Sequence, residues 1–215
     1  MEYPKIETLF GRDENFRVDP SQLKNPVFAM FKQWEVTEKI DGTNMRVTLI
    51  EGEDKIKIDG RTDRASIPGD LFRYMVDTFP VKAVQDMMDL KGAGWEKVVL
   101  YGEGYGAGIQ KGGCYRKDKA FRLFDVLVAD KWWLDWKVVE QVAETLGIKT
   151  APYLGSWTFT EIIERVKVGV PSVVAKEESG QDVIAEGIVA RPIETLFDKR
   201  GNRVILKLKT KDFTN

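Results

Sequence analysis

The chain has 215 residues, enough for one substantial hydrophobic core, and its 33 Lys and Arg against 34 Asp and Glu give a net charge of −1. A nearly neutral chain is not a basic nucleic-acid coat, so any phosphate-binding surface must be a local cluster of cations. With no histidine and a single cysteine, Cys114, the sequence excludes histidine-based acid–base catalysis, Ser-His-Asp triads, His-ligated metals, intrachain disulfides and Cys-rich zinc sites.

The beginning of the chain and its composition predict its cellular location. Its charged beginning has no continuous apolar stretch of the signal-peptide kind, and no apolar run is long enough to span a bilayer. One unpaired cysteine fits a reducing compartment, so we expect a soluble monomer in the cytoplasm, or in the host cytoplasm if a phage encodes it. Without repeats, linkers or composition shifts, residues 1–215 are expected to form a single domain with no C-terminal accessory domain.

Stretches rich in β-branched and aromatic residues predict strands, and apolar residues at helical spacing predict helices. In chain order, the predicted strands are Trp34–Glu38, Met45–Ile50, Lys55–Asp59, Val98–Gly102, Phe121–Val128, Gly187–Arg191 and Arg203–Lys209. The predicted helices are Pro68–Phe79, Val81–Leu90, Asp135–Leu146 and Thr160–Val168. Residues 51–54 form a hairpin turn and residues 197–203 a second turn. This mixture predicts an α+β fold, with antiparallel sheets flanked by helices.

Lys39 ends the first predicted strand, in the sequence Glu-Lys-Ile-Asp-Gly-Thr-Asn. An ordinary charged hairpin turn explains this heptad as well as a reactive lysine does. A lysine becomes a nucleophile only when its amine loses a proton, and its ordinary pKa is about 10.4. Burial or neighbouring cations must therefore lower that pKa in a reactive site.

The last predicted strand supplies such cations. Strand alternation places Val204, Leu206 and Leu208 on one face and Lys207 and Lys209 on the other. The two ammonium groups either face solvent or form a clamp for a polyphosphate.

Three carboxylates sit beside glycines where strands end: Asp41, Glu103 and Glu186. Plain turns have the same composition. Alternatively, the three side chains together hold a divalent cation, in part through its water shell.

Aromatic residues leave two further choices open. Phe124 lies in the apolar strand Phe121–Val128, where it either joins the core or stacks on a base. The group Trp132, Trp133 and Trp136 is either a base-stacking platform or, as we expect, part of a helix packed on a sheet. Cys114 receives no role.

In this order, these segments resemble the motifs of the covalent nucleotidyltransferases, which include polynucleotide ligases and mRNA capping enzymes. Lys39-Ile-Asp-Gly-Thr-Asn resembles motif I, Tyr101-Gly-Glu-Gly motif III, Phe121-Arg-Leu-Phe-Asp-Val motif IIIa, Glu186-Gly-Ile-Val motif IV and Leu206-Lys-Leu-Lys motif V. The asparagine of motif I and the short spacing resemble the RNA ligase 2 branch, although Asp41 replaces the histidine that this branch often has.

The resemblance implies an ATP-dependent RNA ligase that joins 3′-OH and 5′-phosphate RNA ends, with ATP as AMP donor and Mg²⁺ or Mn²⁺ as cofactor. Lys39 would carry AMP, and Lys207 and Lys209 would contact the triphosphate. The nucleotide-binding residues it implies are Glu38, Asn44, Arg61, Glu103, Phe124 and Glu186, of which Glu103 and Glu186 would also bind the metal. The alternatives are a DNA ligase, a GTP-dependent capping-type nucleotidyltransferase and an inactive nucleic-acid-binding module.

Overall fold

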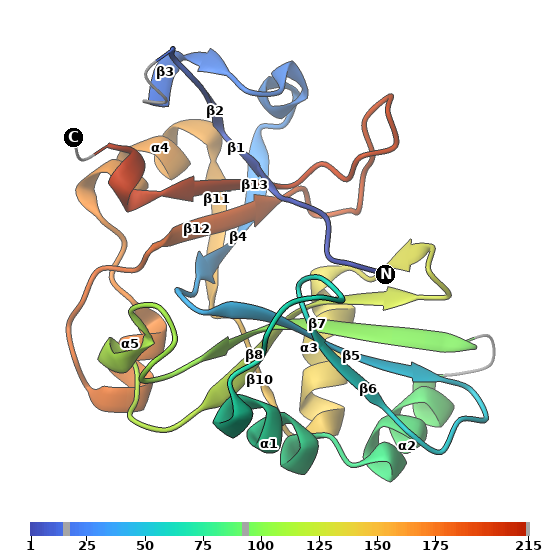
Figure 1. Cartoon of the computed structure of the whole chain (residues 1–215). Helices are drawn as coiled ribbons and strands as arrows, with labels where there is room; N and C mark the ends of the chain where they lie inside the picture. Colours follow the sequence, from blue (N-terminus) through green and yellow to red (C-terminus); the bar gives the residue numbers. More distant parts are fainter. Residues whose placement is uncertain (15–17, 92–94, 214–215) are drawn as a thin grey trace. The chain divides into compact units, whose positions relative to one another are not determined.

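The computed structural model describes residues 1–14, 18–91 and 95–213 and divides into two compact units (Figure 1). Unit 1 comprises Met1–Pro4 and Asp41–Ala151, and unit 2 comprises Lys5–Ile40 and Pro152–Asn215. Each unit is therefore built from segments that are distant in the sequence.

Unit 1 is a six-stranded sheet with helices packed against it (Figure 1). Its strand order is β10-β8-β7-β5-β6, and β9 pairs with β8. The strands are β5 (Thr43–Ile50), β6 (Lys57–Gly60), β7 (Lys97–Tyr105), β8 (Ala120–Val128), β9 (Trp132–Trp133) and β10 (Lys149–Thr150). The helices are α1 (Gly69–Thr78), α2 (Val81–Lys91), the 3₁₀ turn η2 (Gly112–Cys114) and α3 (Trp136–Leu146).

The sequence shows why α3 forms where it does. Val139, Val142 and Ala143 recur at helical spacing and are buried against the rest of unit 1. The helix ends at Gly147, which adopts a positive φ of 66° and donates its backbone N–H to the last turn.

Unit 2 is a five-stranded sheet in the order β1-β13-β12-β4-β11, with a separate two-stranded sheet of β2 and β3. Its strands are β1 (Glu7–Thr8), β2 (Phe10–Arg12), β3 (Val18–Leu23), β4 (Gln33–Lys39), β11 (Tyr153–Thr158), β12 (Gly187–Arg191) and β13 (Leu206–Lys209). Its helices are α4 (Phe159–Val168), α5 (Val173–Ser179) and the 3₁₀ turns η1 (Pro26–Met30) and η3 (Thr210–Asp212). Trp34 and Val36 of β4 pack with Ile162 of α4 in one hydrophobic core.

The α+β prediction is confirmed, and antiparallel pairing dominates both large sheets; β1–β13 and β10–β8 are parallel. Two details were wrong. Helix α4 is capped by Thr158, whose side chain and Glu161 form a reciprocal capping box, so Thr160 lies inside the helix. Trp132 and Trp133 form the short strand β9, and only Trp136 belongs to a helix.

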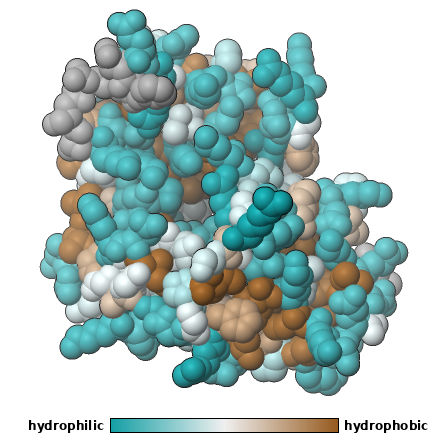
Figure 2. Space-filling view, viewed as in Figure 1, coloured by the Kyte–Doolittle hydropathy of each residue, from teal (hydrophilic) through white to brown (hydrophobic). Residues whose placement is uncertain are grey.

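The described part of the chain contains no helix long and apolar enough to cross a membrane. Figure 2 shows hydrophobic side chains gathered over α1, where Phe72 and Val76 are four residues apart and partly exposed. The same helix buries Leu71 and Met75, so apolar residues lie on two of its faces.

Candidate functional site

Three residues of unit 2 stand in one row across its central strands. Gly187, the first residue of β12, pairs with Lys39 at the end of β4 and with Lys209 at the end of β13. Directly opposed residues project their side chains to the same face of a sheet. Two lysines that are 170 positions apart in the sequence are therefore neighbours across a glycine.

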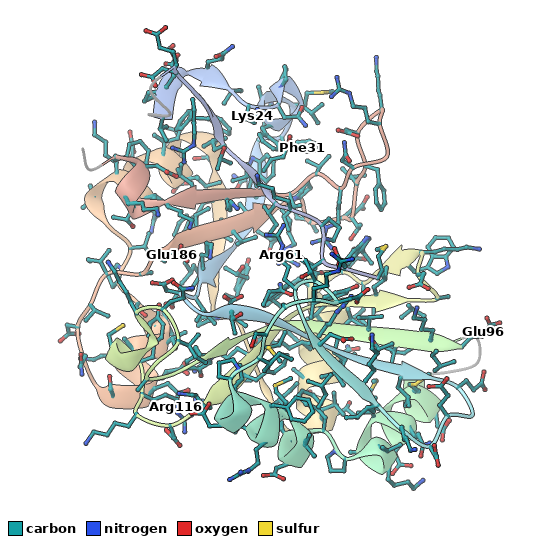
Figure 3. The ribbon with its side chains drawn as sticks, viewed as in Figure 1. Lys24, Phe31, Arg61, Glu96, Arg116 and Glu186 are labelled. Atoms are coloured by element: carbon teal, nitrogen blue, oxygen red, sulfur yellow. The ribbon has the colours of Figure 1, made fainter. Side chains whose placement is uncertain are left out.

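Glu186 bridges these two lysines from the position before the row, and Figure 3 labels it. Its Oε2 is 2.5 Å from Nζ of Lys39, and its Oε1 is 2.5 Å from Nζ of Lys209. The three side chains are only 15–22% exposed. Burial opposes ionisation of Glu186, but the two ammonium groups outweigh it and lower the pKa of that carboxyl below its ordinary value.

The backbone on both sides of Glu186 is fixed by the chain that follows β13. Thr210 donates its backbone N–H to the carbonyl oxygen of Glu186, and its hydroxyl donates to the carbonyl of Ala185. The next residue, Gly187, has a φ of +156°, and a Cβ there would meet the carbonyl oxygen of Leu208 at 2.1 Å. A glycine is therefore required for the close strand contact that brings the lysines together.

Lys207 lies two residues from Lys209 and faces the same side of β13. The core face predicted for this segment is confirmed, because Val204, Leu206 and Leu208 are buried in the unit 2 core. The regular strand is shorter than predicted and begins at Leu206. Lys207 pairs with Val189 of β12, which places it two residues along the strands from the pair Gly187 and Lys209.

Glu38 is predicted to lie beside a nucleotide base and to contact it through its backbone, and its carboxylate is bonded to helix α5 of its own unit. Its two oxygens accept hydrogen bonds from the Ser172 hydroxyl at 2.6 Å and from the backbone N–H groups of Val173 at 2.8 Å and Val174 at 3.1 Å. The residue is 2% exposed. Glu38 thus anchors the end of β4, next to Lys39, to the start of α5.

A second row of polar residues crosses the sheet of unit 1. Asn44 of β5 pairs with Glu103 of β7, and Glu103 pairs with Arg122 of β8. Arg122 is buried and donates to the hydroxyl of Tyr105. The Asn44 Oδ1 is also buried, and it has no hydrogen-bond partner among the residues that the structure describes. A buried acceptor left in this state fits a donor that belongs to a ligand.

Phe124 occupies a bulge in β8. Tyr101 pairs with Asp125 and Gly102 with Leu123, so Phe124 is the extra residue between them. Its ring is partly exposed and meets the ring of Tyr3 edge-on, with centroids 5.1 Å apart. The regular pairing of β8 with β7 is interrupted here, and Phe124 is the one residue of β8 that is not buried.

Asp41 and Gly42 form the turn after Lys39. The Asp41 backbone N–H donates to the hydroxyl of Tyr115 at 3.1 Å. A Cβ on Gly42 would meet the carbonyl oxygen of Gly104 at 2.3 Å, so the turn lies close against β7. No pattern in the sequence pointed to Tyr115, because this contact joins residues 74 positions apart.

Arg61 follows β6 directly and is exposed (labelled in Figure 3). The preceding Gly60 pairs with Met45, the neighbour of Asn44. The predicted site residues therefore form one group in unit 2, namely Glu38, Lys39, Glu186, Lys207 and Lys209, and another in unit 1, namely Asp41, Asn44, Arg61, Glu103 and Phe124.

The described residues contain no cluster of three or more His, Cys, Asp or Glu side chains that would cage a metal ion. A small hard cation such as Mg²⁺ does not need one, because it keeps several waters and binds one or two carboxylates together with phosphate oxygens. Glu186 in unit 2, and Asp41 and Glu103 in unit 1, are each carboxylates of the kind that can bind such a cation or its waters.

Comparison with known proteins identifies a family. A family model described as RNA ligase matches residues 32–209, which include every predicted site residue. The matched segment also contains both rows described above.

Solved structures of an RNA ligase from Naegleria gruberi share the fold. A variant with ATP and Mn aligns with a TM-score of 0.67 and 20% identity over 97% of this chain and 56% of that chain. The form with PPi aligns with a TM-score of 0.64 and 20% identity, over 98% of this chain and 62% of that chain. A variant with AMP and Mn aligns with a TM-score of 0.63 and 20% identity, over the same shares of the two chains. The present chain thus spans less than two thirds of the length of these ligases.

Proposed function

The chain belongs to the RNA ligase family, and we propose that it is an ATP-dependent RNA ligase that joins 3′-OH and 5′-phosphate RNA ends through a lysyl-AMP intermediate. The observation that carries the proposal is the row of Lys39, Gly187 and Lys209, with both ammonium groups on the carboxylate of Glu186. Two cations that already hold one anion in a partly buried site are suited to hold a phosphate. The Naegleria gruberi ligase, solved with ATP, AMP or PPi, supports a nucleotide as the ligand.

In the first step, Nζ of Lys39 attacks the α-phosphorus of ATP. Before the attack, the ammonium gives up one proton to solvent and exposes its lone pair. An N–P bond then forms, the bond from that phosphorus to the bridging oxygen breaks, pyrophosphate leaves, and the nitrogen loses a second proton to solvent. Lys39 has no lone pair for this attack while its ammonium donates to Glu186. We therefore expect the bound nucleotide to draw Glu186 and Lys39 apart, as its phosphates compete for the lysines.

Lys209 and Lys207 then act on the phosphates. Phosphoryl transfer depends on charge neutralisation and alignment more than on acid–base catalysis, which suits a chain without histidine. We assign Lys209 to the phosphate nearest Lys39 because the two lysines share one row, and Lys207 to the departing pyrophosphate.

In the second step, a 5′-phosphate oxygen of RNA attacks the same phosphorus, and the N–P bond breaks to release Lys39. In the third step, a 3′-OH attacks the activated 5′-phosphate, a phosphodiester forms, and AMP leaves. The buried acceptor Oδ1 of Asn44 suits a hydroxyl or a metal-bound water, since both donate hydrogen bonds.

The remaining residues of unit 1 would hold the nucleoside. Phe124 is partly exposed at its bulge, so its ring can stack on adenine. Glu103 would accept hydrogen bonds from the ribose, and Arg61 would contact the ribose or a phosphate. In unit 2, the Glu38 side chain is bonded to α5, so we assign its nucleotide contact to the backbone.

In unit 2, Glu186 would bind the waters of a divalent cation, Mg²⁺ or Mn²⁺. In unit 1, Asp41 and Glu103 are the carboxylates that we assign to metal binding. Such a cation neutralises the charge that develops on phosphate oxygens during transfer. Glu186 is suited to this role because its pKa is lowered, so its carboxylate is ionised at neutral pH.

The first test is the mass of the intact protein after incubation with ATP and Mg²⁺ or Mn²⁺. We expect a gain equal to one AMP, located on Lys39 by peptide mapping and reversed by added pyrophosphate. Lys39→Ala should show no gain, because the attacking nitrogen is gone.

The control is Lys32→Ala, an exposed lysine seven positions before Lys39. It should gain AMP at the wild-type rate. A parallel incubation with GTP decides between ligase and capping-type chemistry. AMP found on another lysine, or none on the wild type, would contradict the proposal.

A further inference from the structure

A loop of unusual composition joins two of the three strands that carry the lysine row in unit 2. It comprises residues 192–205, between β12 and β13, and is called the connecting loop here. In Figure 1 it is the red segment that extends from the ends of these strands. Phe197 and Arg203 form an isolated antiparallel bridge in it, and Val204 donates its backbone N–H to the carbonyl of Leu196.

The tip of the connecting loop has a fixed conformation. The Asp198 carboxylate accepts hydrogen bonds from the backbone N–H groups of Arg200 at 2.8 Å and Asn202 at 2.9 Å. Gly201 provides the positive φ of 77° that the turn needs. Side chains at this tip are consequently presented on an ordered support.

Large apolar side chains are exposed along the connecting loop: Ile193 is 64% exposed, Phe197 51% and Leu196 37%. Exposed groups of this kind mark binding surfaces more often than isolated apolar residues do. An exposed phenylalanine ring in particular can stack on the face of any nucleic-acid base.

Cations are close to Phe197 in the sequence. Residues 197–203 contain Lys199, Arg200 and Arg203 against the single acid Asp198, whose oxygens face the turn backbone. This is a local net charge of +2 in a chain whose total charge is −1. It is the kind of local cluster that a nearly neutral chain needs to bind phosphates.

The connecting loop follows directly after Arg191, the last residue of β12. In β12, Gly187, Val189 and Arg191 alternate on the face of the lysine row, and Lys207 pairs with Val189. The four steps from Gly187 to Arg191 span about 14 Å, or only a few nucleotide steps. A strand whose end lies at Lys39 and Lys209 can therefore reach the loop within the same unit.

We propose that the connecting loop binds the single-stranded part of the RNA substrate behind its reacting end, with Phe197 stacking on a base and Lys199 and Arg200 contacting phosphates. This inference rests on the proposed ligase function and adds a substrate contact to it. Aromatic rings interleaved with cations are the usual means of binding single strands without reading their sequence.

The experiment measures binding of a fluorescent, 5′-phosphorylated, unstructured oligoribonucleotide to the full chain across a salt series. Phe197→Ala should weaken binding about tenfold or more, the usual effect of removing a stacked ring. The double variant Lys199→Ala/Arg200→Ala should lower the slope of log affinity against log salt by about 1.4, at about 0.7 for each phosphate contact.

The matched control is Lys167→Ala/Val168→Ala, which removes an exposed cation and an 88% exposed apolar residue from α4 of the same unit. It should bind RNA like the wild type. Affinities of the loop variants equal to this control would overturn the proposal, as would a change in self-association at unchanged RNA affinity. AMP transfer to Lys39 needs no RNA and is measured separately, so its absence from the wild type contradicts the ligase function without deciding the role of the loop.

Discussion

In unit 2, two carboxylates of the site bind donors of the protein, whereas in unit 1 a buried acceptor, Oδ1 of Asn44, has no hydrogen-bond partner among the described residues. In unit 2, the Glu186 carboxylate holds two ammonium groups and the Glu38 carboxylate holds three donors of α5 and its cap. In unit 1, the buried Oδ1 of Asn44 has no partner in the part of the chain that the structure describes. The two rows are built alike, since each crosses three antiparallel strands. They differ in the groups that they offer to a ligand: cations in unit 2 and a hydrogen-bond acceptor in unit 1.

This difference between the units indicates that unit 2 is suited to bind an anion and unit 1 a hydrogen-bond donor. A carboxylate held between two lysines occupies the place that a phosphate can take, so unit 2 is arranged for negative charge before a ligand arrives. An unpaired buried acceptor carries a free-energy penalty of about 1–3 kcal/mol that a hydroxyl or water can relieve. The comparison predicts that changes in the lysine row affect chemistry, while a change at Asn44 affects folding stability little.

Replacement of Lys209 by alanine should have the largest effect. We expect AMP transfer to Lys39 to slow by about 10²–10³-fold, as when a preorganised donor to a developing charge is removed. The fold should persist, because Lys209 is at a strand end and partly exposed. Single-turnover rates with labelled ATP measure the effect, and Lys211→Ala, an exposed lysine two positions away, is the control.

A near-normal rate of AMP transfer in Lys209→Ala would contradict this comparison. The ion pair between Glu186 and Lys209 would then have only a structural role. A slow rate with an unchanged melting temperature would support the assignment.

The second prediction compares the two units directly. Glu38→Ala leaves the Ser172 hydroxyl and two backbone N–H groups without their acceptor, and should reduce the free energy of unfolding by about 2–3 kcal/mol. Asn44→Ala removes an acceptor that receives no hydrogen bond from the described residues. It should reduce the free energy of unfolding by less than about 1 kcal/mol. Urea denaturation of both variants measures the difference.

The effect of Asn44→Ala on ligation should be larger than its effect on stability. The variant is expected to remain folded and yet to seal RNA poorly. If Asn44→Ala proves as destabilising as Glu38→Ala, the amide belongs to the fold and the contrast between the units disappears.

The sequence predicted the strands that bear the site better than the remainder of the fold. β4, β7, β8 and β12 have β-branched and apolar residues that lie in a core, so their pattern is strong. The edge strand β3 (Val18–Leu23) was missed because none of its residues is buried, half are exposed, and it contains a proline. Helix α5 was missed because it has only seven residues and begins with two valines, which favour strands.

The side-chain partners were less accessible from sequence than the strands. Alternation alone put Lys207 and Lys209 on one face, but it could not show that Glu186 bridges Lys39 and Lys209, which depends on the pairing of three strands. The sequence contains the S/T-x-x-E spacing of the capping box of Thr158 and Glu161, but the prediction missed it and began the helix at Thr160. The bulge at Phe124 was not, because a bulge is set by the register of the partner strand.

The smallest expected effect concerns the pH dependence of stability in unit 2. The lysines pull the folded-state pKa of Glu186 below its ordinary value of 4.5, so its ionised form stabilises the fold above that pH. This contribution should fade as the pH falls through the lowered pKa, because the carboxyl is then protonated in both states. Glu186→Gln should therefore be less stable than the wild type at pH 7, with the difference narrowing toward pH 3.

Urea denaturation of the wild type and of Glu186→Gln at each pH measures this difference. Solvent screens the partly exposed lysines, so the effect is expected to be modest. Other carboxyls titrate equally in both proteins and cancel in the difference between their unfolding free energies. A difference that stays constant from pH 7 to pH 3 would mean that the amide substitution destabilises by packing alone, and that the ionic bridge between the two lysines adds nothing to the stability of the row.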